Sequence, residues 1–493
     1  MTDTQNNEMA ARDLAEFRLM RGEAVPDRER AGALAGRAAE RVLAEAAPVR
    51  DAIRLLCEMS ADEDEEIARM GGRALFGGLI ERLNDSFEPA ACGIYDRLFA
   101  QVIDFYRRRP GAEPLDEALR GFGLATEADL SARKSRLRDA PTFSRQGGSI
   151  KRVLLPSRVT IGADVALTSV IIAKLREALP NAEFVFLGSP KLRELYGGDA
   201  RIRVRPLGYE RSGRVQSRLA SWLDVLAAVR EERRDLGPEE LLIIDPDSRL
   251  TQLGLLPLIE GDVGYHFFES RAYRHPEAAR IGELASRWLA ERFGLPEMAF
   301  PFLALPPAHA DFGRRLGESL RRGGARHLTT ISFGVGGNEE KRISAAFERA
   351  LIEERLAASS TLVLDKGASP DERRQIDEIL EGVRAQGRTV VEVAPESAAV
   401  WMGRDVIHAD VLTWDGGIGE FAGLIAAADR YIGYDSAGQH LAAALRVPTL
   451  TLFVNANSAT FAERWRPFGP GPISVAGFRP DNLPVSPREI GEL

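Results

Sequence analysis

Residues 430–453 read RYIGYDSAGQHLAAALRVPTLTLF, and this stretch decides the fold class. An apolar run ends at Tyr434 and is followed by Asp-Ser, residue types that favour a helix N-cap. A helix is expected over about 437–446, and the next apolar run begins at Pro448. Strand, helix and strand in this order predict a βαβ unit, in which the two strands are parallel.

The same alternation extends over the chain from Lys151 onward. The first set of expected strands is RVLLPSRV, EFVFLG, IRVRPLG and ELLIIDPD, with helices such as ADVALTSVIIAKLREAL between them. A proline-rich break at 300–313, FPFLALPPAHADFG, precedes a second set, which is HLTTISFG, STLVLDKG, TVVEVA, RYIGY and TLTLFVN. Each set predicts a parallel sheet covered by helices on both faces. The sequence therefore predicts an α/β protein with two doubly wound domains and a cleft at the carboxyl ends of their strands.

The amino-terminal part has a different composition. AGALAGRAAERVLAEAAPVRDAIRLLCEM is rich in Ala, Leu, Arg and Glu, and its apolar residues recur every three or four positions. PTFSRQGGS at 141–149 has the composition of a linker. We therefore expect three domains, an all-helical one over 1–148 and two α/β domains over 149–312 and 313–493.

Composition limits the function classes. The 493 residues include 65 Lys+Arg and 73 Asp+Glu, a formal net charge of −8, which argues against nucleic-acid binding through a large basic surface. Two cysteines, Cys57 and Cys92, cannot build a disulfide framework and fit a reducing compartment. The amino terminus lacks the pattern of a secretory signal, and no apolar run approaches the roughly 18 residues that span a bilayer. We expect a cytoplasmic protein without a transmembrane segment.

The strongest local signal for chemistry is the helix that follows Asp435. Backbone N–H groups at its start, beside the small residues Ser436, Ala437 and Gly438, form a ready site for an anion such as phosphate. His440 lies one turn further, where an imidazole could reach that anion. An ordinary βαβ turn with an Asp/Ser N-cap explains Asp435 equally well. Spacing alone leaves these two interpretations open.

A second signal is TTISFGVGGNEEKRI at 329–343. A strand enters a glycine-rich turn that carries Lys341, and this combination lets backbone and one mobile charge approach phosphate oxygens. Neither a Walker loop nor a GxGxxG pattern is present, which weakens a P-loop or dinucleotide interpretation.

A third signal is Asp164 in VTIGADVALTS at 159–169, where a helix is expected to start at the end of the first strand of its domain. The carboxylate is either a first-turn residue favoured by the helix dipole or a general base that deprotonates an acceptor hydroxyl. The six histidines show no zinc-binding spacing, and we expect no metal site.

The stretch from about 151 to 470 resembles the family 9 glycosyltransferases, the heptosyltransferase-like enzymes of lipopolysaccharide biosynthesis. The similarity is carried, in chain order, by IGADVALTSVIIAKLREALPNAEFVFLG, ELLIIDPDSRLTQLGLLPL, ISFGVGGNEEKRIS, WDGGIGEFAGLIAAADRYIGYDSAGQHLAAALRVPTLTLF and RWRPFGP. The resemblance implies the GT-B fold, with an acceptor-side domain over 149–312 and a nucleotide-sugar donor domain over 313–493. Residues 1–148 lie outside it.

The resemblance also implies roles for single residues. Asp164 would be the catalytic base that activates the acceptor hydroxyl. The residues implied to bind the donor are Gly336, Gly337, Lys341, Gly416, Asp435, Ser436, Ala437, Gly438 and His440. The chain departs from the family pattern at Ala163, which separates the usual Gly-Asp pair, and at Ala437, where a glycine is usual.

The chemistry implied by the resemblance is an inverting transfer of a sugar, such as heptose, from a nucleotide-diphosphate donor, such as an ADP-linked one. It uses no metal and no cofactor besides the donor. The acceptor, a glycan or a protein, is left open, and so is contact with a membrane surface. We interpret residues 1–148 as a packing or oligomerisation domain. Two alternatives stay open, a non-catalytic GT-B-like module whose helical domain binds a protein partner and a nucleotide-sugar epimerase.

Overall fold

The computed structural model of the chain describes residues 3–23, 27–45, 47, 49–138, 149–209, 214–484 and 486–490. The chain forms two compact units, and each is made of two segments. Unit 1 comprises Met1–Val159 and Pro206–Arg274, and unit 2 comprises Thr160–Arg205 and His275–Leu493. The three domains expected from the sequence stay a prediction, and the expected linker at 141–149 lies outside the described residues except for Ser149.

The amino-terminal part of unit 1 is helical, as the composition predicts. Its helices are α1 (Asp3–Met20), α2 (Arg28–Ala44), α3 (Arg50–Ser60), α4 (Glu65–Arg73), α5 (Glu81–Asp85), α6 (Pro89–Tyr106), α7 (Glu113–Gly121) and α8 (Glu127–Arg138). A π-helical segment, η1 (Ala74–Ile80), joins α4 to α5 without a break. The carboxylate of Asp64 starts α4 by accepting hydrogen bonds from two backbone N–H groups, which is the usual role of an N-cap residue.

Unit 1 also contains strands β1 (Arg152–Pro156), β4 (Leu241–Asp245) and β5 (Tyr265–Phe267) and the long helix α12 (Val215–Glu232). Strand β4 pairs in parallel with β1 on one side and with β5 on the other. All five residues of β4 are buried, as expected for a central strand covered on both faces. Two single turns, η4 (Arg249–Thr251) and η5 (Glu260–Asp262), link β4 to β5.

The sheet that positions the site lies in unit 2. Its seven strands are β6 (His327–Ser332), β7 (Ser360–Asp365), β8 (Val390–Val393), β9 (Val411–Trp414), β10 (Arg430–Tyr434), β11 (Thr449–Val454) and β12 (Ile473–Phe478). They run in the order β12-β11-β10-β6-β7-β9-β8, and each pair is parallel. The carboxyl ends of β6, β7, β9 and β10 therefore meet at one edge.

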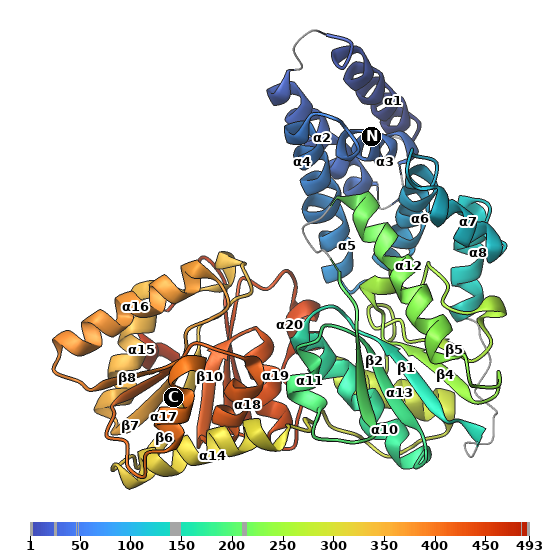
Figure 1. Ribbon diagram of the computed structural model, residues 1–493. Coiled ribbons are helices and arrows are strands. Elements are labelled where there is room, and N and C mark those ends of the chain that lie inside the picture. The colour runs from blue at the N-terminus through green and yellow to red at the C-terminus, as the bar shows by residue number, and fades with distance from the viewer. Residues whose placement is uncertain are drawn as a thin grey trace. The chain divides into compact units, whose positions relative to one another are not determined.

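Helices cover both faces of this sheet, with α14 and α16 on opposite sides (Figure 1). The helices are α14 (Pro307–Arg322), α15 (Ala345–Ala357), α16 (Pro370–Ala385), α17 (Pro395–Met402), α18 (Ile418–Ala427), α19 (Ala437–Ala444) and α20 (Ala459–Trp465), with the turns η6 (Glu339–Lys341) and η7 (Pro487–Ile490). A buried apolar cluster from β6, β7, β10, β11, α15 and α16 forms the core on one face. The prediction of an α/β protein with a helical amino-terminal region and parallel sheets is confirmed.

The first segment of unit 2 supplies α9 (Ile161–Ala163), the π-helical segment η3 (Asp164–Thr168), α10 (Ser169–Ala178), β2 (Glu183–Gly188), α11 (Leu192–Tyr196) and β3 (Ile202–Pro206). Helix α13 (Ile281–Phe293) opens the second segment and packs on α10. The helix predicted over 163–179 is present as a continuous helical stretch from Ile161 to Ala178, in which the π-helical segment η3 joins α9 to α10 without a break.

Three strands are absent from the sequence prediction, β5, β9 and β12. Strand β5 has only three residues, too few for a periodic pattern to emerge. Strand β9 is as short as the predicted strand β8, but all four of its residues are buried, so it lacks the alternation that marks β8. Strand β12 lies at the sheet edge, and none of its residues is fully buried, so it lacks an apolar run. Helix α19 ends at Ala444 rather than at 446.

Candidate functional site

A cavity of about 330 Å³ lies in unit 2 at the carboxyl ends of β6, β7 and β10 and in the loop after β9. Ser332 ends β6, Asp365 ends β7, and Ser436 follows β10 at the start of α19. Ligands of parallel α/β sheets bind at this edge, where helix starts and loop backbone converge. The start of α19, which the sequence predicts as an anion site, therefore lines a cavity of the described chain.

Five residues that the sequence singles out line this cavity. They are Gly336, Gly416, Ser436, Ala437 and Gly438. The other candidates, Asp164, Gly337, Lys341, Asp435 and His440, are not among the described residues that line it.

Gly438, at the start of α19, is required because the side chain of Tyr431 packs against it. A Cβ atom on Gly438 would lie 2.1 Å from the hydroxyl oxygen of Tyr431, and one on Gly433 would lie 2.3 Å from the same atom. Since real Cβ contacts do not become this short, only glycine fits above this buried phenol. The absence of side chains leaves the backbone of α19 exposed to the cavity.

The start of α19 is the part of the cavity suited to an anion. Its N-cap is Ser436, whose hydroxyl caps no backbone N–H, and no acidic residue stands in the first turn. The first N–H groups of a helix have no partner within the helix, and the dipole adds partial positive charge there. Helix α9 packs closely on this turn, since a Cβ on Gly162 would lie 3.2 Å from the Cα of Ala437.

Lys341 lies beside α19 but is held by an ion pair. Its Nζ is 2.7 Å from Oδ2 of Asp435 and 5.6 Å from the ring centroid of Phe461. The other carboxylate oxygen of Asp435 accepts a hydrogen bond of 2.7 Å from Nε2 of Gln439. The structure thus brings two of the predicted residues together, and Asp435 balances the charge of Lys341.

His440 is buried in the same network, with Nε2 3.2 Å from Nε2 of Gln439. Burial lowers the pKa of His440 to about 4, the carboxylate of Asp435 opposes this shift, and the charge of Lys341 adds to it. The imidazole is therefore neutral at pH 7. It contributes no positive charge to an anion, although it retains one N–H group.

Asp164 is 1% exposed and begins the π-helical segment η3. Its Oδ1 accepts a hydrogen bond of 3.0 Å from Oγ1 of Thr168, four residues further along the chain. Segments α9 and η3 both pack against α19, so the structure brings the chain around Asp164 next to the predicted phosphate site.

Acidic residues that the sequence analysis missed also line the cavity. Glu194, on α11, accepts a hydrogen bond of 3.0 Å from the backbone N–H of Gly419 in the first turn of α18. The helix dipole stabilises a carboxylate in this position. The start of α18 is therefore already supplied with an anion, in contrast to the start of α19.

Asp365 and Glu372 are the other carboxylates among the described residues that line the cavity. Burial raises the pKa of Asp365 to about 6, and hydrogen bonds from the Gly367 N–H and the Ser332 hydroxyl oppose the shift. Burial also disfavours ionisation of Glu372, but hydrogen bonds from backbone N–H groups, among them that of Val335, lower its pKa below the ordinary value. Ser369 and Glu372 form a capping box, a pattern that the sequence DKGASPDE displays and that could have located this helix start.

Two cations also line the cavity, Lys191 and Arg373. Arg373 forms an ion pair of 2.9 Å with Asp415 in the loop after β9. Trp414 lies under that loop, is 1% exposed, and donates a hydrogen bond to the carbonyl of Gly417. A Cβ on Gly416 would lie 2.1 Å from the indole, so this glycine is fixed by the packing of Trp414.

Among the described residues, no three His, Cys, Asp or Glu side chains are grouped in a way that would hold a metal ion. None of the helices in the described ranges combines the length and apolar character needed to cross a bilayer.

Comparison with known families finds one match. Residues 416–475 match the family described as glycosyltransferase family 9 (heptosyltransferase). This segment begins at Gly416 in the loop after β9 and contains all of α18 and α19 and strands β10 and β11. The resemblance stated from the sequence is therefore confirmed over the stretch that supplies one side of the cavity. No curated protein matches the chain.

Several solved structures are similar to the chain at low sequence identity. A family 9 glycosyltransferase from Veillonella parvula is 15% identical, with a TM-score of 0.48 over 68% of this chain and 87% of that one. E. coli ADP-heptose LPS heptosyltransferase II is 15% identical, with a TM-score of 0.46 over 69% and 96%. E. coli heptosyltransferase WaaC, solved with ADP, is 14% identical, with a TM-score of 0.45 over 66% and 93%.

Proposed function

We propose that this protein is a glycosyltransferase that moves a sugar from a nucleotide-diphosphate donor to an acceptor hydroxyl. The observation that carries the proposal is the start of α19, which opens on the cavity through Ser436, Ala437 and Gly438 and lies inside the segment that matches family 9. Lys341 lies beside this helix start, paired with Asp435, although it does not line the cavity. The start of α19 would hold the diphosphate, and Lys341 would add positive charge next to it.

In this proposal the two ends of the donor contact different groups of the cavity. Backbone N–H groups of α19 hold the diphosphate, and each charge-assisted hydrogen bond of this kind contributes about 1.5–3 kcal/mol. The carboxylates of Glu194 and Asp365 accept hydrogen bonds from the hydroxyl groups of a ribose or a sugar. Gly416 lies where a nucleotide base would be bordered by the loop after β9.

The proposed reaction is a single displacement that inverts the anomeric carbon. The acceptor oxygen forms a bond to that carbon as its proton passes to Asp164, and the bond from the carbon to the diphosphate oxygen breaks. The leaving diphosphate takes the electron pair and is stabilised by the start of α19 and by Lys341. The proposal needs no metal, and metal independence stays a prediction.

The identities that we propose for the donor and the acceptor rest on the resemblance to family 9. We take an ADP-linked heptose as the first donor to test and a glycan of the lipopolysaccharide type or a protein side chain as the acceptor. A cytoplasmic location and an oligomer formed through residues 1–148 belong to the same set of proposals.

Asp164→Asn tests the catalytic role of the carboxylate. If Asp164 is the base, the variant loses about 10²–10⁴-fold in kcat and keeps its affinity for the donor. Thr168→Val is the matched control, because it removes the hydroxyl that donates to Asp164 and leaves the carboxylate in place. Measurement of kcat and of donor Kd for both variants checks the assignment, and wild-type kcat in Asp164→Asn would refute it.

A non-catalytic module is the second candidate. The burial of Asp164 and the ion pair between Lys341 and Asp435 favour it, since both groups already have partners within the chain. Thermal unfolding with a panel of nucleoside diphosphates and nucleotide sugars separates the candidates. Stabilisation by a nucleotide together with turnover supports the transferase, whereas no stabilisation by any of them supports the module.

A further inference from the structure

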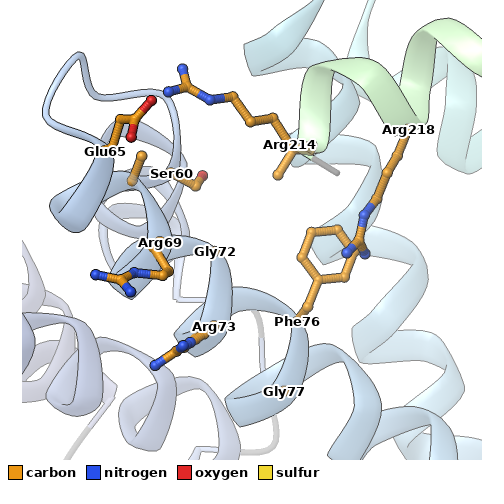
Figure 2. A pocket seen from close by; sticks show the side chains of 11 residues that line it. Ser60, Glu65, Arg69, Gly72, Arg73, Phe76, Gly77, Arg214 and Arg218 are labelled. Atoms are coloured by element: carbon orange, nitrogen blue, oxygen red, sulfur yellow. The ribbon is translucent and has the colours of Figure 1, made fainter. Parts of the chain in front are cut away.

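A second cavity, of about 620 Å³, lies within unit 1 between α4, η1 and the start of α12 (Figure 2). Its volume falls in the range of small-molecule sites in proteins. Four arginines line this cavity, Arg69 and Arg73 on one side and Arg214 and Arg218 on the other. The one carboxylate among the described residues that line it is that of Glu65.

The arginines are placed so that they repel one another. Arg69 and Arg73 are four residues apart on α4 and therefore lie on the same face, and Arg214 and Arg218 lie one turn apart at the start of α12. Arg69 is 3.1 Å from Glu66, but Arg73 and Arg214 form no ion pair with any residue in the described ranges. The positive charge of the cavity therefore exceeds the negative charge that the described chain supplies.

Packing fixes one of these guanidinium groups. The Cζ atom of Arg218 lies 3.9 Å from the ring centroid of Phe76, in a cation–π contact visible in Figure 2. Phe76 belongs to the π-helical segment η1, and such segments are frequent at functional sites. A stacked guanidinium loses less freedom when it binds an anion than an extended, solvated one does.

The floor of the cavity has room for a ligand. A Cβ atom on Gly72 or on Gly77 would meet no other atom within 4 Å. Both glycines line the cavity and lie in helical segments, so neither is required there by packing. The hollow is therefore formed by absent side chains rather than by a tight turn.

We propose that this cavity binds a phosphate-bearing ligand, a phosphomonoester or a diphosphate. Phosphate carries up to two charges on one group and presents several acceptor oxygens, so it can engage guanidinium groups from both sides at once. The cavity is larger than a single phosphate needs, which indicates that the phosphate is attached to a larger molecule. Segments α4 and η1 lie outside the stretch that resembles transferases, whereas Arg214 and Arg218 lie inside it. The inference rests on the arginines of this cavity alone and does not depend on the proposed function.

The test is binding of inorganic pyrophosphate, measured by calorimetry, to the full chain carrying Gly438→Val, a substitution whose Cβ collides with Tyr431 and removes the diphosphate site proposed in unit 2. The cavity variant is Arg73→Gln with Arg214→Gln. The matched control is Arg82→Gln with Arg230→Gln, which removes the same charge from exposed arginines of α5 and α12 that do not line the cavity. A third variant, Gly72→Leu, fills the hollow and keeps every arginine. We expect about tenfold weaker binding in both cavity variants and near wild-type binding in the control.

A second arm distinguishes a soluble ligand from a lipid-linked phosphate. Flotation compares phosphatidylcholine vesicles with vesicles that also contain phosphatidic acid. Loss of either pyrophosphate or phosphatidic acid binding in both cavity variants, with the control unaffected, supports the proposal and identifies the source. Equal binding by all four proteins in both arms, or an equal loss in the control, would overturn it. Gly72→Leu keeps the test valid if the double variant does not fold, because leucine favours a helix more than glycine does.

Discussion

The cavity of unit 2 is lined by helix backbone, small residues and carboxylates, whereas the cavity of unit 1 is lined by four arginines and an aromatic ring. In unit 2, Arg373 in the lining is paired with Asp415, and Lys341 beside the cavity is paired with Asp435. In unit 1, Arg73 and Arg214 form no ion pair with the residues that the structure describes. Selectivity for a whole nucleotide sugar fits the first design, and strong attraction of a phosphate fits the second.

The difference also lies in what fixes each cavity. Gly438 and Gly416 are required by the aromatic residues beneath them, so the unit 2 cavity is specified by packing. Gly72 and Gly77 have open space around them, so the unit 1 cavity would tolerate larger side chains without strain. Substitutions of glycine should therefore have opposite consequences for stability in the two regions.

The largest expected effect is that of Gly438→Val. The new Cβ would collide with the hydroxyl of Tyr431, at an unrelaxed distance of 2.1 Å, and push α19 away from its place. We expect a loss of about 1–3 kcal/mol in the free energy of unfolding and loss of nucleoside diphosphate binding by about 100-fold or more. Urea unfolding and calorimetry measure the two quantities.

Gly382→Ala, in α16, is the control for this substitution, because its Cβ meets no atom within 4 Å and alanine is the better helix former. It should leave binding unchanged and raise the stability by about 0.5–1 kcal/mol. If the Gly438→Val variant binds a nucleoside diphosphate with wild-type affinity, the proposed position of the diphosphate at α19 is wrong.

A smaller effect is expected from removing charge in each cavity. Lys341→Gln should weaken nucleoside diphosphate binding by about tenfold, near the lower limit for a charged hydrogen bond, because Asp435 already pairs with the lysine. Arg73→Gln with Arg214→Gln should leave the KM for the nucleotide-sugar donor, which reports on the unit 2 cavity, unchanged. Donor KM measured for both variants checks the comparison, and a donor KM that depends on the unit 1 arginines would break it.

The smallest effect is a pH dependence confined to unit 2. The pKa of Asp365 is raised to about 6 by burial, so its carboxylate is charged at neutral pH, and we expect it to repel the phosphates of a donor bound in the same cavity. Protonation on acidification removes this repulsion, and affinity for a nucleoside diphosphate should rise about threefold between about pH 7.5 and pH 5.5. The arginines of unit 1 stay charged throughout this range.

Asp365→Asn isolates this effect, since titration of the ligand itself is the same in both proteins. The ratio of the two dissociation constants should approach unity at low pH and deviate at high pH. A ratio that does not change with pH would show that Asp365 does not face the bound phosphates.

The fold was predictable where a single strand or helix carries its own pattern. The apolar runs that became β6, β7, β10 and β11 are long and bounded by turn residues, and the helix start at 437 follows directly from Asp435 and Ser436. Strands β9 and β12 escaped prediction because one is buried throughout, without alternation, and the other is half-exposed at the edge.

The site was predictable only in part, because its other half depends on distant contacts. Glu194 reaches the start of α18 from 225 positions away, and no local pattern marks it. The burial of Asp164 and His440, which decides their charge and access, is likewise a property of the packed chain. Gly438 could be read from the sequence, but the reason that a glycine is needed there, its contact with Tyr431, could not.

The most direct test of the central claim is a crystal structure of the full chain with ADP. We expect the diphosphate to lie within hydrogen-bond distance of the backbone N–H groups of Ala437 and Gly438, with the base beside the loop at Gly416. A diphosphate bound away from the start of α19, or a cavity that stays empty at saturating ADP, would contradict it.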